Sequence, residues 1–309
     1  MTRSVARSAA ALLLLLGAAP LVSCGSESSG FALELRYLAS LEELPQSQRD
    51  VFEGAAQRIR SIVKGGLRPV TTRSDGQPLT CGDGADAVAL DERVEGLLIL
   101  VSVRDLGPGT LAQSGPCIVR QSSRLPAVAI LRFNSTYIDT YENTGQLGAV
   151  VLHEMLHTLG FGTVWEDFPG LVTGPLSEPA YNGDAALAAA KRENSAPASW
   201  TAIPVENCGT GSPIDCSPAY EPSCCLGTRD AHWRETVFGN ELMTGWVTPG
   251  ASPLSAMSIG ALQDLGYRVE LRGADAFSLA PALRSFTPVE PVFLGDDVLR
   301  DPPKVADEP

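Results

Sequence analysis

The pattern of apolar and polar residues predicts a sheet and a long helix in the first half of the chain. Three short apolar runs, bounded by glycine, proline or polar residues, have the pattern of buried strands: residues 33–38, 96–103 and 127–133. Apolar residues recur at helical spacing over residues 45–64, until Gly65 and Gly66 end the pattern. We therefore expect one twisted sheet with an amphipathic helix packed against it.

A second long helix is expected around two neighbouring histidines. Thr144 can cap this helix, which should end near Gly160. Beyond it, Pro, Gly, Ser and Cys dominate and predict mostly loops, with helices at residues 184–191 and 254–265. The tail after Ser285 is Pro-rich and acidic, so we expect it to be partly disordered. The predicted fold class is α+β, with a loop-rich C-terminal half.

The N-terminus has the features of an export signal. A basic start precedes an apolar core that is too short to span a bilayer. Residues 21–24 (LVSC) resemble the lipobox of bacterial lipoproteins, whose cysteine is lipidated before cleavage on its amino side. We expect residues 1–23 to be a lipoprotein signal peptide, Cys24 to carry the lipid, and residues 24–30 to form a flexible tether. The alternative is ordinary secretion, with Cys24 an incidental residue of the leader.

The remaining six cysteines suggest disulfides, because their number is even in a chain with an export signal. Cys81 and Cys117 form a plausible local pair. The other four lie in one loop-rich stretch: Cys208, Cys216, Cys224 and Cys225. A zinc knuckle is the competing interpretation, but the spacing lacks the usual two-residue gap of such sites.

Length and charge narrow the possible partners. The 309 residues suffice for one large domain or two subdomains with a shared core. A net charge of −13 argues against nucleic acid or an anionic membrane surface as the partner, and weakly favours a neutral or basic polypeptide. The sequence does not specify the oligomeric state.

The run from His153 to His157 carries the strongest chemical signal. These two histidines lie four residues apart, so a helix brings both onto one face, where they suit two positions of a tetrahedral zinc site. Glu154 can take a proton from a zinc-activated water that attacks a carbonyl, and can pass it to the leaving amine. A hydrolytic zinc needs a third protein ligand. In this chain the choices are His232, which is the only other histidine, a carboxylate or a thiolate.

Residues 153–161 (HEMLHTLGF) resemble the active-site helix of the metzincin metallopeptidases, in which a glycine, here Gly160, lets the chain turn toward a third ligand. Most of that clan has a histidine three residues after the glycine, where this chain has Thr163. The leishmanolysin family instead has a long insertion at this point. Residues 232–245 and the helix that follows them are similar to that branch.

The resemblance covers about residues 31–280 and implies a metzincin-type zincin in two parts. Residues 31–162 would form an N-terminal catalytic subdomain that ends in the active-site helix. Residues 163–285 would form a C-terminal subdomain with the third ligand and the methionine turn, followed by a tail at 286–309. The segment 208–225 looks like an addition beside the family core, most simply a disulfide-stapled surface loop.

The same resemblance implies a role for each site residue. His153, His157 and His232 would bind one catalytic Zn²⁺, and Glu154 would be the general base. Met243 would match the methionine that lies beneath the metal and supports it without ligation.

These features lead to the hypothesis of a zinc-dependent endopeptidase that cleaves polypeptides outside the cytoplasm while lipid-anchored to a bacterial membrane or cell surface. One alternative is a surface lipoprotein that keeps the fold as a binding or adhesion module, but such a module has no need for Glu154. Another is zinc-dependent hydrolysis of a non-peptide substrate. Because only a short spacer follows Cys24, we expect no N-terminal prosegment. The acidic tail could cover the cleft, but we expect a disordered terminus instead.

Overall fold

The computed structural model describes Met1 and residues 30–38, 44–193, 195–207, 227–247, 250–279 and 292–308. Apart from Met1, the predicted signal peptide lies outside the described residues, and so do the lipidation candidate Cys24 and the four cysteines of segment 208–225. Among the described residues, no helix has the length and apolar character needed to cross a bilayer.

A five-stranded sheet forms the centre of the N-terminal half, in the order β1-β7-β9-β8-β15. Its strands are β1 (Leu33–Tyr37), β7 (Leu97–Arg104), β8 (Ala112–Arg120), β9 (Pro126–Asn134) and β15 (Lys304–Ala306). β1, β7 and β9 run parallel, β8 runs antiparallel to β9, and β15 runs parallel to β8. The three strands predicted from apolar runs are confirmed as neighbours in one sheet. Those apolar runs are nearly continuous because both faces of the sheet are covered.

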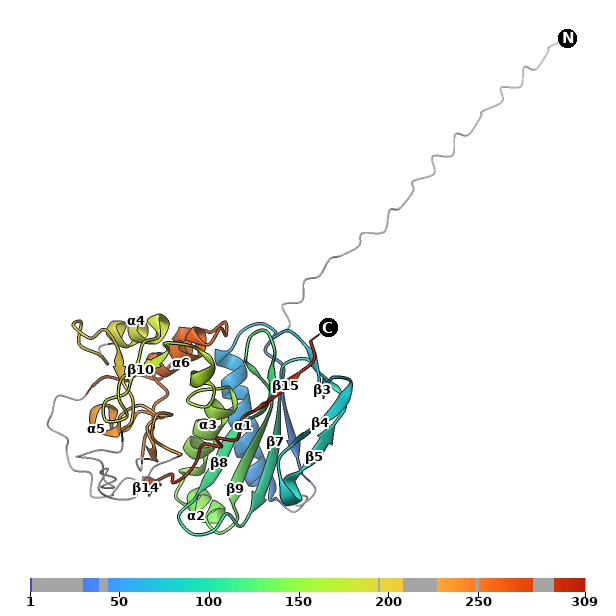
Figure 1. Ribbon diagram of the computed structural model, residues 1–309, viewed down its shortest axis with the longest axis horizontal. Helices are drawn as coiled ribbons and strands as arrows, with labels where there is room; N and C mark the ends of the chain where they lie inside the picture. The colour runs from blue at the N-terminus through green and yellow to red at the C-terminus, as the bar shows by residue number, and fades with distance from the viewer. Residues whose placement is uncertain are drawn as a thin grey trace.

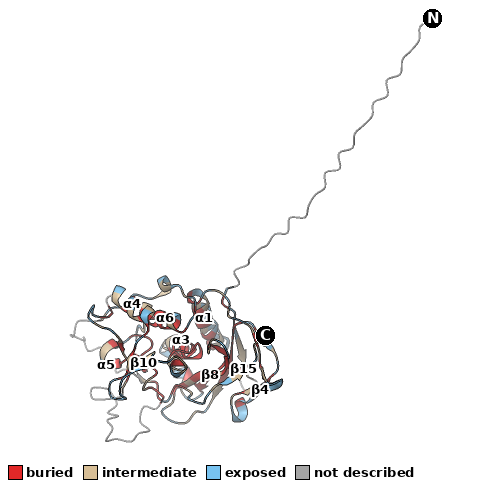
Figure 2. Cartoon of the chain, turned by 45° about the horizontal axis from the view of Figure 1, so that its top comes forward, coloured by how far each residue is buried: buried red, intermediate tan, exposed pale blue. Residues whose placement is uncertain are grey.

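Two helices, α1 (Gln46–Ile62) and α3 (Leu147–Thr158), cover one face of this sheet (Figure 1). Phe52 of α1 is fully buried and packs edge-on against Phe133 of β9, with ring centroids 5.1 Å apart. α3 is buried along almost its whole length, and Figure 2 shows α3 and β8 among the buried elements at the centre of the molecule. The two predicted long helices are therefore confirmed.

The predicted start of the second helix was wrong. Thr144 lies at the end of a short helix, α2 (Ile138–Asn143), and its hydroxyl donates back to the Thr140 carbonyl at 3.0 Å. Gly145 then adopts φ +73°, which interrupts the helical path, and α3 begins only after Gln146.

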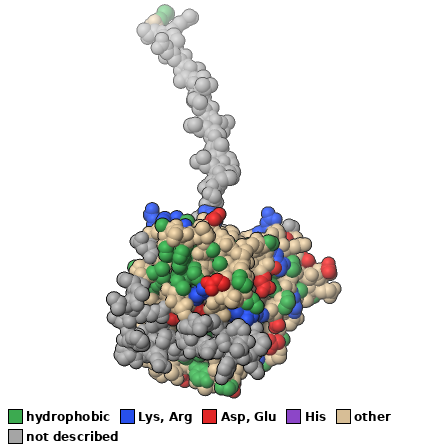
Figure 3. Space-filling model, turned by 60° about the vertical axis from the view of Figure 1, so that its left-hand side comes forward, with side chains coloured by type: hydrophobic (Ala, Val, Ile, Leu, Met, Phe, Trp, Pro, Cys, Tyr) green, Lys and Arg blue, Asp and Glu red, His purple; other side chains and the backbone are tan. Residues whose placement is uncertain are grey.

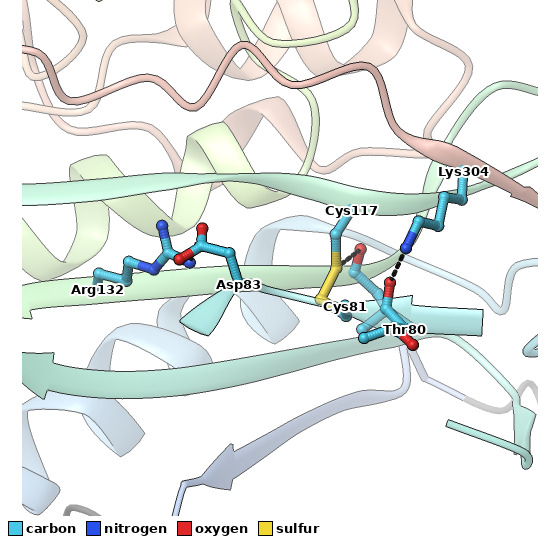
Figure 4. Close-up of a disulfide and its surroundings, with 7 residues drawn as sticks. Thr80, Cys81, Asp83, Cys117, Arg132 and Lys304 are labelled. Atoms are coloured by element: carbon cyan, nitrogen blue, oxygen red, sulfur yellow. Dashed lines mark hydrogen bonds and ion pairs between the residues drawn. A yellow bond between two sulfur atoms is a disulfide. The ribbon is translucent and has the colours of Figure 1, made fainter. Parts of the chain in front are cut away.

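Small antiparallel sheets cover the other face of the main sheet. They consist of β2 (Val70–Thr71), β3 (Arg73–Ser74), β4 (Gln77–Cys81), β5 (Val88–Leu90) and β6 (Arg93–Val94), with a 3₁₀ turn at Gly84–Asp86. The disulfide between Cys81 and Cys117 joins β4 to β8, as the local pairing predicted (Figure 4). These strands were not predicted, because their short runs lack a clear alternation.

The C-terminal half is mostly irregular, as expected. Its helices are α4 (Asp184–Arg192), α5 (Glu235–Phe238) and α6 (Ala256–Asp264), with 3₁₀ turns at Trp165–Asp167 and Leu271–Gly273. Its strands are β10 (Val172–Thr173), β11 (Ala180–Tyr181), β12 (Ile203–Pro204), β13 (Trp246–Val247) and β14 (Val292–Phe293). Both predicted helices are present, and Ser255 caps α6 by accepting a hydrogen bond from the Ser258 backbone N–H.

The C-terminal tail differs from expectation. Its described part, residues 292–308, pairs with β13 through β14 and with β8 through β15, and thus runs between the two halves (Figure 1, red). Leu294, Val298 and Ala306 are almost completely buried. The prediction of disorder weighed the acidic and proline residues and overlooked these spaced apolar ones, which provide the burial that holds the segment in place.

Candidate metal centre

Three histidines from two distant parts of the chain meet in the interior. His153 and His157 project from one face of α3, and His232 lies just before α5. The three Nε2 atoms lie 3.1 Å (His153 to His232), 3.0 Å (His153 to His157) and 2.9 Å (His157 to His232) apart. All three side chains are fully buried, and the face of the molecule in Figure 3 shows no histidine. The structure thus brings together the complete histidine complement of the chain.

Backbone carbonyls orient all three rings. The Nδ1 atom of His153 lies 2.7 Å from the Leu242 carbonyl oxygen, and that of His157 lies 2.7 Å from the Phe161 oxygen. The Nδ1 atom of His232 lies 2.9 Å from the Thr228 oxygen. A carbonyl oxygen only accepts, so each Nδ1 must carry the proton and donate it. In a neutral imidazole this leaves Nε2 without a proton, so Nε2 presents a lone pair that can only accept.

The three lone pairs need a cation between them. Acceptors about 3 Å apart repel one another unless a positive charge lies among them. Protonation of the rings is a poor source of that charge, because burial lowers the pKa of His153 and of His157. Two ligands of a tetrahedral zinc, each about 2.0–2.1 Å from the metal, lie roughly 3.3 Å apart, close to the observed spacing. The histidines therefore fit a zinc ion.

A carboxylate that the sequence analysis missed completes the cluster. Asp297, between β14 and β15, places Oδ2 at 3.2 Å from Nε2 of His232 and 3.4 Å from Nε2 of His153. The side chain is fully buried, and neither oxygen has a hydrogen-bond partner among the described residues. His153, His157, His232 and Asp297 offer four ligand atoms within 4.8 Å of one another. These four residues could hold one metal ion.

Glu154 is also buried, one residue along α3 from His153. Its Oε2 accepts a hydrogen bond from the Ser114 hydroxyl of β8 at 2.6 Å, whereas Oε1 has no partner among the described residues. Burial, together with the nearby Asp297 carboxylate, raises the pKa of Glu154 well above its ordinary value, and the Ser114 hydroxyl opposes this shift. Two carboxyl groups and three lone pairs buried in one cluster match a divalent cation, because buried negative charge is costly without a counter-charge.

Gly160 and Met243, which were predicted to support the site, lie next in sequence to residues whose carbonyls orient the histidines. Gly160 follows α3 with φ +103°, and the turn it makes directs the Phe161 carbonyl to His157. Met243 is fully buried, and its backbone N–H donates to Glu241 Oε2 at 2.6 Å. The residue before it, Leu242, is the one whose carbonyl orients His153. The predicted support of the metal by Met243 itself stays a prediction.

Sequence reasoning missed Ser114 and Asp297. Ser114 lies inside β8 and has no motif that marks it. Asp297 follows Asp296 in an acidic tail, and the only available signal was the apolar residues around this pair, Leu294 and Val298.

Comparison with known proteins supplies independent evidence. No curated protein matches the chain. The family model described as Leishmanolysin matches residues 93–283, which include His153, Glu154, His157 and His232 and end before Asp297. Because this match covers more than half of the sequence and contains the histidine cluster, the chain belongs to the leishmanolysin family of metallopeptidases.

Proposed function

We propose that this protein is a zinc-dependent endopeptidase of the metzincin type. His153, His157 and His232 would hold one catalytic Zn²⁺, and Glu154 would act as the general base. One observation supports this proposal most strongly. Three Nε2 atoms that carry no proton lie within 3.1 Å of one another, and each imidazole donates from Nδ1 to a backbone carbonyl. Membership of the leishmanolysin family supports the same reading.

When bound, the metal supplies a Lewis acid that activates water and polarises the scissile carbonyl. The protein residues would move the proton. Ser114 donates to Oε2 of Glu154, and Oε1, which has no partner among the described residues, would accept a proton from the attacking water. Glu154 would then deliver this proton to the leaving amine.

The proposed cellular location is outside the cytoplasm. Removal of residues 1–23 would leave Cys24 as a lipid-modified N-terminus. The disulfide between Cys81 and Cys117 supports this location, because such bonds persist mainly in oxidising compartments. Mass spectrometry of the exported protein tests the proposal, since Cys24→Ala should abolish the lipid adduct.

The alternative, a surface lipoprotein that only binds, explains Glu154 less well. A buried carboxylate oxygen without a hydrogen-bond partner costs stability. A binding module would gain nothing from this cost, whereas amide hydrolysis requires a base at this position.

The test compares bound zinc with cleavage of fluorescently labelled casein. We expect about one zinc per chain in the wild type and in Glu154→Gln, with cleavage by Glu154→Gln reduced about 10²–10⁴-fold. His153→Ala should lose the zinc. Glu53→Gln, the same change at an exposed position of α1, should alter neither value. A folded wild-type chain without zinc, or full activity in Glu154→Gln, would refute the proposal.

A further inference from the structure

The C-terminal segment crosses the site between the two halves of the molecule. We call residues 294–300 the strap. On the sheet side, the Leu111 N–H donates to the Leu294 carbonyl, and the Gln113 side-chain amide donates to the Asp296 carbonyl at 3.0 Å. On the opposite side, the Leu294 N–H donates to the Gly245 carbonyl at 3.1 Å. The strap is thus hydrogen-bonded to both halves of the molecule.

Two further contacts hold the strap on the side of the third histidine. The Thr228 hydroxyl donates to the Gly295 carbonyl at 2.8 Å, and Thr228 is the residue whose own carbonyl orients His232. The Arg300 guanidinium donates to the Arg229 carbonyl. Beyond the strap, β15 adds to the main sheet, and Lys304 donates to the Thr80 carbonyl beside the disulfide (Figure 4).

Pairing with Ser114 sets the position of Asp297. The Ser114 N–H donates to the Asp297 carbonyl at 2.7 Å, and the Leu299 N–H donates to the Ser114 carbonyl at 2.9 Å. The Asp297 backbone carbonyl is therefore held by β8, while its side chain reaches the histidine cluster. The group that meets the cluster is a carboxylate and not a peptide carbonyl, so the strap offers no scissile bond there.

The strap also covers the edge of β8 that does not pair with β9. One side of β8 pairs with β9, and the strap and β15 take the other side. An extended peptide is commonly bound by adding a strand to such an edge, because the backbone hydrogen bonds are independent of sequence. A polypeptide that used this edge to reach Glu154 would need the backbone groups of Ser114 that the strap now engages.

The number of ligands points to the same conclusion. A catalytic zinc site keeps three protein ligands and one open position, whereas four protein ligands close the coordination sphere. The three histidines alone would leave the metal open. With Asp297 added, the cluster offers four ligand atoms.

We propose that the strap makes this enzyme latent. Asp297 is a displaceable fourth ligand of the metal, and residues 294–300 cover the β8 edge where a polypeptide substrate binds. This inference rests on the metal site of the proposed function and adds its regulation.

The test uses the full exported chain loaded with Co²⁺, whose visible absorption reports its ligands. Asp297→Asn keeps the shape of the side chain and removes its charge, and Asp301→Asn is the matched control at an exposed position just beyond the strap. Acetohydroxamate serves as the probe of an open ligand position. Circular dichroism verifies folding. If Asp297→Asn does not fold, Asp297→Ala is the second variant.

We expect Asp297→Asn to change the Co²⁺ spectrum and to bind acetohydroxamate at least about tenfold more tightly, because an intramolecular competitor at millimolar or higher effective concentration is removed. For the zinc-loaded protein, kcat/KM on labelled casein should rise by a similar factor. Asp301→Asn should match the wild type in all three measurements.

Two results would refute the proposed role of the strap without refuting the proposed function. The first is an unchanged spectrum with an unchanged acetohydroxamate Kd, which would mean that Asp297 does not contact the metal. The second is loss of Co²⁺ from folded Asp297→Asn, which would make Asp297 a permanent ligand. Failure of the folded wild type to bind any metal would instead overturn the proposed function, and the strap with it.

Discussion

Replacing Gly160 by alanine tests whether the turn after α3 supports the metal site. Gly160 has φ +103°, and a Cβ atom there would lie 2.7 Å from Cγ2 of the buried Val164. Gly266 offers a matched control, because it also follows a helix, has φ +109°, and an added Cβ there would meet no atom of the described residues within 4 Å. The two substitutions impose nearly the same backbone strain, but only one adds a steric clash.

The expected costs follow from these geometries. A residue with a side chain in the left-handed region costs about 1–2 kcal/mol, which is the whole effect expected for Gly266→Ala. At Gly160 the clash adds the cost of overpacking, about 1–3 kcal/mol, because a buried valine has no flexible end that can move away. We therefore expect Gly160→Ala to lose about 2–5 kcal/mol of the free energy of unfolding.

Urea unfolding of the metal-free proteins measures the stability difference, and competition with a chelator measures zinc affinity. Because the turn positions the Phe161 carbonyl against His157, Gly160→Ala should weaken zinc binding about 10–100-fold, as loss of an orienting contact usually does. Gly266→Ala should leave zinc affinity unchanged. Equal losses of stability in the two variants, or unchanged zinc affinity in Gly160→Ala, would refute the reasoning.

Three further predictions concern the disulfide, an ion pair and the metal. Replacing Cys81 and Cys117 together by alanine should lower the free energy of unfolding by about 4 kcal/mol, from the entropy of a 36-residue loop; a loss below about 1 kcal/mol in urea unfolding would contradict this. Arg36 donates to both carboxylate oxygens of Glu92 and lowers its pKa, so this pair stabilises the fold above the ordinary carboxyl pKa, and its contribution is lost as the pH falls. Glu92→Gln should therefore cost less than about 1 kcal/mol at pH 7, since the side chain is 38% exposed, and progressively less as the pH falls through the lowered pKa of Glu92; a cost independent of pH would contradict the assignment. Chelation should lower the melting temperature of the wild type, since zinc at about 100 times its Kd contributes about 2.7 kcal/mol, but it should not affect His153→Ala; equal shifts in a thermal scan would place the metal elsewhere.

The sequence predicted the parts of the fold with strong periodicity. The apolar runs at β1, β7 and β9 and the helical spacing of α1 identify elements whose burial follows directly from the pattern. The short strands from β2 to β6 escaped prediction because runs of two to five residues are too short to show a clear alternation. The start of α3 was misplaced because Thr144 is a good cap in general, and only the path of the chain shows that Gly145 interrupts it.

The candidate site was predictable where its residues share one helix or a motif. His153, Glu154 and His157 follow from helical spacing, and His232 follows from the family resemblance and is the only remaining histidine. Asp297 could not be predicted, because its place depends on a strand pairing with Ser114 that joins residues far apart in the chain. Composition instead favoured disorder for that segment.

The carbonyls that orient the three histidines have a consequence for protein engineering. They come from the main chain of Phe161, Thr228 and Leu242, so the side chains at these positions take no part in the hydrogen bonds to the imidazoles. Unlike a carboxylate in the same place, a carbonyl neither titrates nor disappears on mutation. Libraries that vary these three positions could therefore reshape the surroundings of the metal while every imidazole keeps its tautomer, provided that the backbone path survives.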